Sequence, residues 1–553
     1  MIKLWKPGTV GSPKIKLGDS QRGAIARVVF VWTFITLACT RTYVGPADLT
    51  ATVAARQPGQ PAAVTSEPAA ALPATPQPVD PQPQPTAAAI GSGGEQAPPR
   101  ILDTVQPAQP EKPKSTRRPP ILYYAQAGDT LPAAAVRFGV AVEQITSPDP
   151  LPAGPSLLRP GQLLLVPAEL ENTSPETALL PDSEIVYSPS ALDFNINEFV
   201  QQGGGYLVSY RESLSSGTYT GAEIVERVAV ENSINPRLLL ALLEYRAHWV
   251  YGTPQNFRET DFPIGNMDVG RKGLYKQLSW AVEQLSLGYY GWRAGLITTL
   301  DFRSQRDNLR LAPTLNAGSV AIQYLFASLM DQSTWSDALY TPNSFPNLYE
   351  QMFGNPWSRA QSVEPLYPPN LQQPQLDLPF KIGSTWSLTG GPHSAWGPNG
   401  ALAALDFAPP GVEHGCGVSD QWVTAMAAGL VLRADNGAVL VDLDGDGHEQ
   451  TGWVILYMHI ANASRVEPGT WVTAGDLIGH PSCEGGVSTG THVHVARKYN
   501  GEWILADGPL SFEMSGWRAH AGREPYKGSL TNGDQTAEAN TFSSYETRVT
   551  RTQ

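Results

Sequence analysis

Apolar and polar positions change their spacing several times along the chain, and each spacing predicts a different kind of structure. Residues 28–38 form one short apolar run, whereas residues 47–120 show no regular apolar spacing. Residues 121–168 combine short apolar runs with a segment at helical spacing, and residues 180–375 carry several such segments. From residue 376 onward, short apolar runs alternate with Gly turns, which is typical of strands. The pattern therefore predicts a multidomain chain.

The first part of the chain is predicted to be an export signal. Basic residues precede the apolar run 28–38, which is too short to span a membrane, since ~20 residues are needed. We therefore expect segment 1–39 to direct export to the cell envelope or outside the cell, with the membrane reached only through this segment. Cys39 directly follows Leu37-Ala38, which resembles a lipoprotein cleavage site, although Thr36 departs from the usual Leu. Lipidation of Cys39 and plain secretion both stay open.

Composition and charge narrow the picture further. Residues 40–120 are rich in Pro, Ala, Gln and Thr, cannot bury enough apolar surface to fold, and are predicted to be a disordered linker. The net charge of −13 argues against a nucleic-acid partner. The 553 residues are enough for three or four domains at ~150 residues each.

A small module is predicted between residues 121 and 168. Its spacing indicates the order strand, helix, helix, strand (β-α-α-β). Asp129 or Thr130 is the expected N-cap of the first helix, and Gly139 suits its C-terminal end.

This segment resembles a LysM module. The resemblance rests on Ala127–Leu131, Arg137–Val140 and Arg159–Pro167, and it implies binding to the glycan of peptidoglycan. The Pro-rich segment 147–157 departs from the family, which usually places an Asn near the glycan there. A spacer that no longer binds sugar is therefore the alternative.

The middle region, residues 180–375, is predicted to be α-helical. Helices are expected at residues 222–231, 237–249, 273–281 and 317–327. Ile234–Leu243 and Gly273–Leu278 faintly resemble the lysozyme-like lytic transglycosylases. The general-acid Glu of that family falls at Arg246, which cannot donate a proton to a leaving oxygen. Glu244 lies two residues away, a rotation of about 200° around a helix, so a degenerate, non-catalytic domain is predicted.

Residues 376–530 are predicted to form a mainly antiparallel β domain, and residues 531–553 a disordered tail. The expected strands are residues 421–425, 429–433, 438–442, 453–459 and 476–480. Segment 469–479 is expected to be two short strands around a tight turn. Asp442, Asp444 and Asp446 begin like a calcium loop, but Trp453 stands where such a loop needs a Glu, so a hairpin turn is the better interpretation.

Histidines point to metal chemistry in this β domain. Eight of the nine histidines lie between His393 and His520. His492 and His494 alternate along a predicted strand, so that their side chains point to one face, where two imidazoles can serve one ion. A catalytic zinc takes three protein ligands and keeps one position for water, and His393, Asp406 and one histidine of the pair make such a set. The alternative is a strand whose two histidines are merely hydrogen-bonded.

The domain resembles the lysostaphin-type zinc endopeptidases that cut peptidoglycan peptides. The matching segments are His393, Leu405–Ala408, Ala428–Val431, Tyr457–His459, Val472–Gly479 and Ser488–His494. The resemblance implies that His393, Asp406 and His494 bind zinc. It also implies that His459 and His492 are catalytic and lie beside the attacked water and the tetrahedral intermediate. Because the set is complete, an active enzyme is expected rather than a metal-free activator of that family.

Two features depart from that family. Thirteen positions separate His393 from Asp406, a longer spacing than usual, and the inserted residues Trp396–Gly400 must fold outward for both ligands to meet one ion. Cys416 and Cys483 lie in insertions on either side of the site, where we predict a disulfide that pins the two loops.

The sequence thus predicts a cell-envelope zinc metalloendopeptidase that hydrolyses stem peptides or cross-bridges of peptidoglycan and reaches the wall through a LysM module. The alternative is a non-catalytic scaffold that binds peptidoglycan, or a regulator of other wall hydrolases. A third hypothesis, a second glycosidase activity in the middle domain, would require the release of anhydro-sugars.

Overall fold

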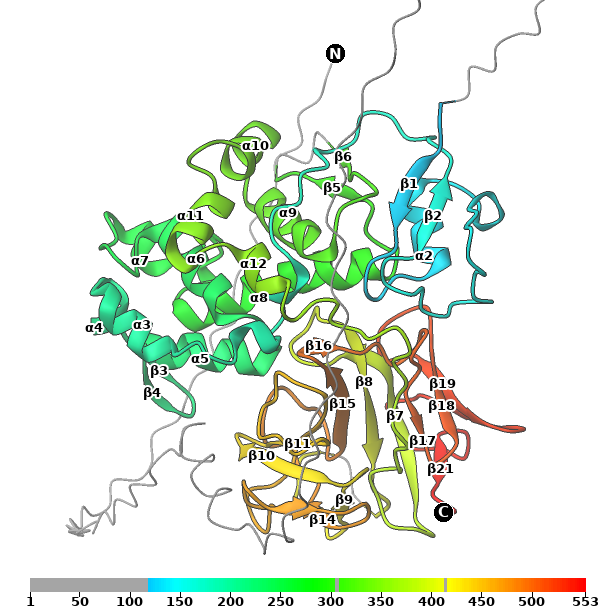
Figure 1. Ribbon diagram of the computed structural model, residues 1–553. Helices are drawn as coiled ribbons and strands as arrows, with labels where there is room; N and C mark the ends of the chain where they lie inside the picture. Colours follow the sequence, from blue (N-terminus) through cyan, green and yellow to red (C-terminus); the bar gives the residue numbers. More distant parts are fainter. Residues whose placement is uncertain (1–117, 304–307, 412–414) are drawn as a thin grey trace, which may run out of the picture. The chain divides into compact units, whose positions relative to one another are not determined.

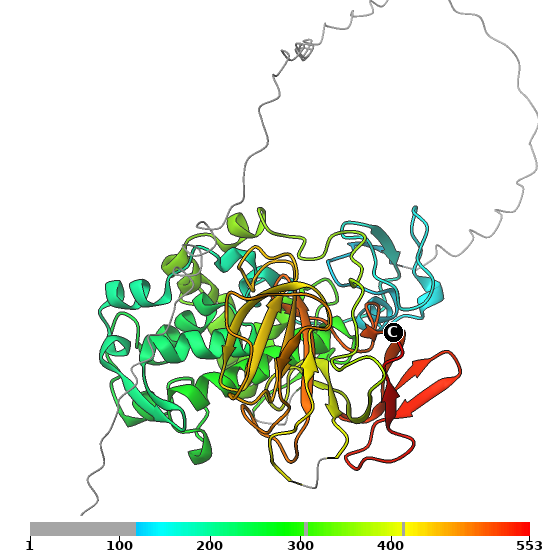
Figure 2. The same ribbon diagram turned by 90° about the horizontal axis from the view of Figure 1, so that it is seen from below.

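The computed structural model describes residues 118–303, 308–411 and 415–553. The predicted signal 1–39, with Cys39, and nearly all of the predicted linker 40–120 lie outside these ranges. Among the described residues, no helix is both long enough and apolar enough to cross a membrane. Figure 1 and Figure 2 show helices in the green part of the chain and strands in the yellow-to-red part.

The small module has two paired strands and one helix. Strand β1 (Ile121–Tyr124) pairs antiparallel with β2 (Leu163–Val166). The helix α2 (Leu131–Phe138) begins with Thr130 as N-cap, whose hydroxyl accepts the Ala133 N–H, and ends at Gly139 with φ 68°. The Asp129 carboxylate instead accepts hydrogen bonds from Tyr123, Gln126 and Arg137.

The second helix predicted for this module is a single 3-10 turn, η1 (Val142–Gln144). Too few residues lie between the end of α2 and the bridge that Thr146 forms with Leu165 for a longer helix. Pro148 adds a second restriction, because the residue before a proline disfavours the helical conformation.

The middle region is helical, as expected, with two small hairpins. Its helices are α3 (Ile196–Gly203), α4 (Tyr206–Ser209), α5 (Gly221–Asn232), α6 (Pro236–Ala247), α7 (Phe257–Asp261), α8 (Leu274–Arg293), α9 (Ala317–Leu329), α10 (Gln332–Tyr340), α11 (Phe345–Phe353) and α12 (Pro356–Ala360). Its hairpins are β3 (Arg211–Leu214) with β4 (Gly217–Thr220), and β5 (Thr299–Asp301) with β6 (Asn308–Arg310). Short 3-10 turns lie at Asp182–Glu184, Pro189–Ala191 and Val269–Arg271. The four predicted helices correspond to α5, α6, α8 and α9.

Local signals set the start of the two central helices. Thr220 and Glu223 form a capping box at α5, in which each side chain accepts the backbone N–H of the other residue. The Asn235 side chain accepts the Arg237 N–H, and Pro236 occupies the first turn of α6.

A nine-stranded antiparallel sheet forms the C-terminal region, in the order β13-β10-β11-β12-β15-β8-β7-β21, with β16 paired to β15. The strands are β7 (Thr385–Ser394), β8 (Leu402–Ala408), β10 (Gly429–Asp435), β11 (Ala438–Asp442), β12 (Trp453–Met458), β13 (Trp471–Val472), β15 (Val493–Tyr499), β16 (Glu502–Trp503) and β21 (Arg548–Thr550). A smaller sheet pairs β9 (Val423–Thr424) with β14 (Leu477–Gly479), and another contains β17 (Glu513–Met514), β18 (Trp517–Ala521), β19 (Gly528–Asn532) and β20 (Gln535–Glu538). The two strands predicted within 469–479 therefore belong to different sheets.

Side chains on the two faces of the large sheet enter different cores. Leu405 of β8 belongs to a cluster confined to the β region. Ala404 of β8 and Ala496 of β15 belong to a cluster that also contains the buried side chains of α5, α6 and α8. Because side chains alternate along a strand, Asp406 and His494 lie on the same face as these two alanines.

The C-terminal tail is ordered, so the predicted disorder of residues 531–553 is wrong. Strands β19 and β20 pair with each other, and β21 adds to the edge of β7 with Thr550 opposite Thr385. Val549 is fully buried, and Arg551 donates to the carbonyl of Phe380. Three-residue strands carry too little periodicity to be recognised, and this pairing partner is remote in sequence.

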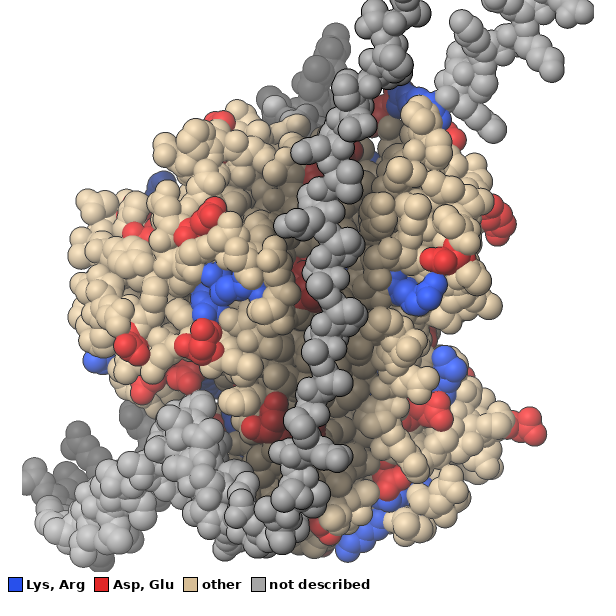
Figure 3. Space-filling view, viewed as in Figure 1, with Lys and Arg blue, Asp and Glu red and all other residues tan. Residues whose placement is uncertain are grey.

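Charged side chains are spread over the surface. On the face shown in Figure 3, Lys, Arg, Asp and Glu lie singly or in small groups among uncharged residues. On this face, the acidic excess is therefore not gathered in one patch.

Candidate active site

Three neighbouring strands bring His393, Asp406 and His494 together. In β15, His494 lies directly opposite Asp406 of β8. Strands β7 and β8 form a hairpin, in which register shifts before and after His393 mark β-bulges that change the direction of side chains. The twelve residues between His393 and Asp406 are taken up by the two strand ends and the loop 395–401. The long spacing thus does not separate the two side chains.

One polar atom from each of the three side chains lies close to the polar atoms of the other two. His393 Nε2 lies 3.0 Å from His494 Nδ1 and 3.2 Å from Asp406 Oδ1, and His494 Nδ1 lies 3.1 Å from Asp406 Oδ1. All three residues are buried. A zinc ion with tetrahedral ligands at ~2.0–2.1 Å would hold those atoms about 3.3 Å apart.

The outer ring nitrogens show which atoms carry protons. His393 Nδ1 lies 2.8 Å from the Gly391 carbonyl oxygen, and His494 Nε2 lies 3.0 Å from the Ala395 carbonyl oxygen. A carbonyl oxygen only accepts, so these nitrogens donate, and in a neutral ring the other nitrogen then carries a lone pair. Two lone pairs and a carboxylate therefore converge in a buried space. This donor set fits a divalent cation, with backbone carbonyls that orient each imidazole.

His459 and His492 lie beside this cluster without joining it. His459 follows β12 and has φ 65°, and its Nδ1 donates to the Glu484 carbonyl at 3.0 Å. His492 precedes β15, and its Nδ1 donates to the Gly490 carbonyl at 2.7 Å. The two rings are 4.5 Å apart, and His492 Nε2 is 3.6 Å from Asp406 Oδ1. Each ring thus has its Nδ1 on a backbone carbonyl, and the Nε2 of His492 faces the Asp406 carboxylate.

Burial and charge act against each other on the acid-base groups. Burial alone would raise the pKa of Asp406, but the charges of His393 and His492 hold it well below its usual range. Burial would lower the pKa of His393, yet Asp406 raises it, so that a cation must compete there with a proton. Burial lowers the pKa of His494, and burial together with the neighbouring His492 lowers the pKa of His459 to about 3.

The structure adds two residues that sequence reasoning did not assign to the site. The Tyr526 ring stacks on His393 with centroids 4.1 Å apart, and its backbone pairs with Gly391 and Pro392. A Cβ on Gly390 would lie 2.5 Å from Asp406 Oδ2, so the carboxylate position requires glycine. Tyr526 lies in the β18–β19 connection, and nothing local in the sequence indicates that this connection reaches β7.

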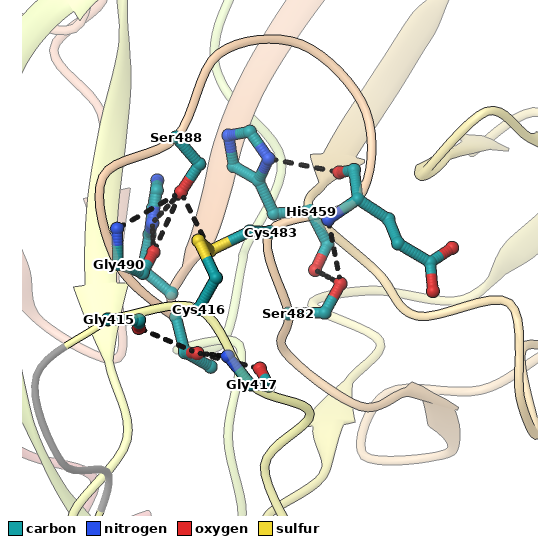
Figure 4. Close-up of a disulfide and its surroundings, with 11 residues drawn as sticks. Gly415, Cys416, Gly417, His459, Ser482, Cys483, Ser488 and Gly490 are labelled. Carbon is teal, nitrogen blue, oxygen red and sulfur yellow. Dashed lines mark hydrogen bonds between the residues drawn. A yellow bond between two sulfur atoms is a disulfide. The ribbon is translucent and has the colours of Figure 1, made fainter. Parts of the chain in front are cut away.

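A disulfide joins Cys416 and Cys483, the pair that the sequence predicts. It joins the loop that leads to β9 to the loop that leads to β15, and Figure 4 shows the bond with its surroundings. The neighbouring residues include His459 and Ser488.

Asp442, Asp444 and Asp446 lie together in the β11–β12 turn. Asp442 accepts from the N–H groups of Asp444 and Gly447, and Asp446 accepts from the N–H of His448. These carboxylates therefore stabilise the turn by accepting hydrogen bonds from its backbone N–H groups.

The middle region holds its two candidate side chains in structural contacts. The Glu244 carboxylate accepts the backbone N–H groups of Val250 and Tyr251 at 2.9 and 3.0 Å, which closes the turn after α6. Arg246 donates to the carbonyl of Ile264 at 3.0 Å. Neither contact provides a glycosidase acid.

Comparison with protein families matches two separate parts of the chain. Residues 410–505 match the model of Peptidase family M23, and residues 178–369 match that of the LasA N-terminal domain. The first match contains His459, His492, His494 and both disulfide cysteines, whereas His393 and Asp406 precede it. The second covers most of the middle region, for which the sequence shows only a faint resemblance to the lytic transglycosylases.

Individual relatives agree with these matches. Protease LasA of Pseudomonas aeruginosa (strain PAO1) is 27% identical over 312 residues, which cover 52% of this chain and 68% of LasA. Beta-lytic metalloendopeptidase of Achromobacter lyticus is 30% identical over 159 residues, which cover 27% of this chain and 39% of the relative.

Solved structures with similarity include the deep-sea M23 metalloprotease pseudoalterin, at 26% identity over 30% of this chain and 96% of that chain, with a TM-score of 0.25. The catalytic domain of lysostaphin from Staphylococcus simulans is 23% identical over 23% of this chain and 89% of that chain, with a TM-score of 0.17. From the family matches, the chain contains a domain of Peptidase family M23, preceded in sequence by a LasA N-terminal domain.

Proposed function

We propose that the protein is a zinc metalloendopeptidase that hydrolyses peptide bonds in the stem peptides or cross-bridges of peptidoglycan. The observation that carries the proposal is the convergence of three lone-pair atoms, from His393, Asp406 and His494. Beside them lie two imidazoles, those of His459 and His492, whose Nδ1 atoms donate to backbone carbonyls. The match to Peptidase family M23 supports the reaction class. The resemblance to lysostaphin-type enzymes supports the substrate.

His393, Asp406 and His494 would hold the zinc ion, which supplies a Lewis acid that polarises the scissile carbonyl and lowers the pKa of water. His459 and His492 provide proton transfer. A neutral imidazole whose Nδ1 proton is held on a carbonyl accepts a proton at Nε2. One of these rings takes the proton of the attacking water as the new C–O bond forms. The imidazolium then donates that proton to the amine nitrogen as the C–N bond breaks.

Targeting to the wall is proposed for the small module 121–168. Its β1-α2-η1-β2 order and its LysM-like motifs support glycan binding. The apolar run before Cys39 supports export to the cell envelope, with or without lipidation. Both proposals have direct tests: pull-down of the full chain with purified sacculi, and mass spectrometry of the N-terminus of the exported protein.

Metal content and turbidity loss of purified sacculi test the enzymatic proposal together. The wild type is expected to bind about one zinc per chain and to clear the suspension. His494→Ala removes a ligand, so zinc and lysis should both fall, the lysis by at least about 100-fold. His520→Ala is the matched control, because the His520 ring contacts Thr531 of β19, in a sheet separate from the strands that carry the cluster.

Two results separate the alternatives. A wild-type protein that binds sacculi but holds no zinc and releases no peptide would be a scaffold, and the enzymatic proposal would be abandoned. Lysis that survives His494→Ala unchanged would likewise rule out this cluster as the site.

A further inference from the structure

The loop of residues 482–490, here named the histidine-orienting loop, holds His459 in place. Ser482 donates to the His459 carbonyl through its N–H at 2.7 Å and its hydroxyl at 3.0 Å. The Glu484 carbonyl accepts the Nδ1 proton of His459, and the Glu484 N–H donates to Ser482 Oγ at 3.0 Å. The residues on either side of Cys483 thus fix both the backbone and the ring of His459. Its φ of 65° is unfavourable for a non-glycine residue and needs such support.

The far end of the same loop orients His492. The Gly490 carbonyl accepts the His492 Nδ1 proton at 2.7 Å and the Ser488 hydroxyl at 2.8 Å. Ser488 Oγ also lies 3.3 Å from Cys483 Sγ. One loop therefore supplies both carbonyls that set the tautomers of His459 and His492. Cys483 directly precedes Glu484 in this loop, and its sulfur contacts Ser488 (Figure 4).

The disulfide ties this loop to residues 415–417. Thr491 donates its N–H to the Gly415 carbonyl at 3.2 Å, donates its hydroxyl to the Gly417 carbonyl at 2.7 Å, and accepts the Gly417 N–H at 3.0 Å. These bonds lie next to His492 in sequence. Cys416 stands between the two glycines, so the covalent bond and the hydrogen bonds fasten the same two segments.

His393, Asp406 and His494, here named the metal-ligand cluster, are held in place by other residues than the histidine-orienting loop. His393 and His494 are oriented by the carbonyls of Gly391 and Ala395, which belong to β7 and the loop after it. The histidine-orienting loop contains Gly485, Gly486 and Gly490, and Val487 within it is 97% exposed. The three glycines give such a segment a large conformational entropy in the unfolded chain, which a cross-link reduces.

We propose that the Cys416–Cys483 disulfide is a positioning element that keeps His459 and His492 aligned for proton transfer, while the metal ligands do not depend on it. The part of this proposal that concerns catalysis, proton transfer by His459 and His492, rests on the proposed function. It makes Cys416 and Cys483 positioning residues, which act only through the carbonyls of Glu484 and Gly490.

The double variant Cys416→Ser/Cys483→Ser tests the proposal in the full chain. The initial rate of turbidity loss is measured against sacculus concentration at a temperature where circular dichroism shows both proteins folded. We expect the maximal rate to fall at least about tenfold, as is usual when groups that orient active-site histidines are lost. The concentration for half-maximal rate and the zinc per chain are expected to stay within about twofold. A rate that is unchanged, or that falls only in proportion to lost zinc, would overturn the proposal.

Reduction of the folded wild type provides a second route if the variant folds poorly. Dithiothreitol should lower the rate to that of the double variant, and reoxidation should restore it. The double variant controls for removal of zinc by the reductant, and it should not respond.

Imidazole NMR signals separate failure of this proposal from failure of the proposed function, since they require no hydrolysis. In the double variant, the signals of His459 and His492 should shift or broaden, and those of His393 and His494 should not. If the wild type cuts nothing, the proposed function fails, while this pattern would still uphold the positioning. Unchanged signals of His459 and His492 would show that the disulfide does not position these two rings.

Discussion

Gly390 lies where any larger side chain would enter the cluster of His393, Asp406 and His494. A Cβ there would lie 2.5 Å from Asp406 Oδ2, and the nearest other contacts are also atoms of Asp406. We therefore expect Gly390→Ala to displace the carboxylate and to weaken zinc binding about 10- to 100-fold. The overpacking should cost only about 1–3 kcal/mol of stability, so that the fold survives. Competition with a zinc-responsive chelator measures the affinity.

Gly270→Ala is the control for this prediction. Its added Cβ would lie in ordinary contact with Asp268, far along the chain from the cluster, so zinc affinity should not change. Equal affinity of Gly390→Ala and the wild type would show that Asp406 does not hold the ion in the position described.

At the scale of elements, β21 completes the edge of the large sheet. Val549 is fully buried opposite Trp386 of β7. We expect Val549→Ala to lower the free energy of unfolding by about 2 kcal/mol, because two buried methyl groups are lost. Arg548→Ala, which alters an exposed neighbour on the same strand, should stay within about 0.5 kcal/mol. Urea titration followed by fluorescence compares the two variants, and equal midpoints would mean that β21 does not pack as described.

Elements with strong local signals were predictable, and those defined by distant partners were not. Asn235-Pro236 places the start of α6 within one residue, because cap and proline act on neighbouring backbone groups. In contrast, β21 is three residues long and pairs with β7, which lies far earlier in the chain. The prediction that residues 531–553 are disordered was wrong for that reason.

In the candidate site, too, local features could be predicted from the sequence and contacts between distant segments could not. Residue types and short motifs indicated the five side chains, because imidazole and carboxylate chemistry is legible in sequence. The bulges of β7 that turn His393 toward Asp406, and the stacking of Tyr526, depend on three-dimensional register. No spacing along the chain encodes these contacts.

At the scale of the whole molecule, one buried arginine joins the helical region to the peptidase region. Arg293 of α8 contacts Asp182 at 3.0 Å and Glu502 of β16 at 3.1 Å. Tyr289 also donates to Glu502, and Glu364 accepts the N–H of Ser183 beside this group. Three carboxyl groups, of which Asp182 and Glu502 are buried, thus lie around one guanidinium, so they cannot all ionise without cost.

Because three carboxyl groups surround one guanidinium, we expect the free energy of unfolding to depend on pH. Burial, together with the charge of Asp182, raises the pKa of Glu364 to about 7. A carboxyl group whose pKa is higher in the folded than in the unfolded state favours folding in its protonated form. Its contribution is complete below about pH 4.3 and is lost as the pH rises through 7. We therefore expect Glu364→Gln, which keeps the oxygen that accepts from Ser183, to be more stable than the wild type at pH 8 by about 1–3 kcal/mol.

The difference between the two proteins should shrink as the pH falls to 5, where Glu364 is protonated in the folded state. Urea titrations at several pH values provide the measurement, and Glu176→Gln, at an exposed position, controls for the general loss of a negative charge. A Glu364→Gln variant that gains no stability at pH 8 would mean that Arg293 compensates all three carboxylates. In that case the junction between the two regions would be held by charge pairs at full ionisation, and its strength would instead fall on acidification.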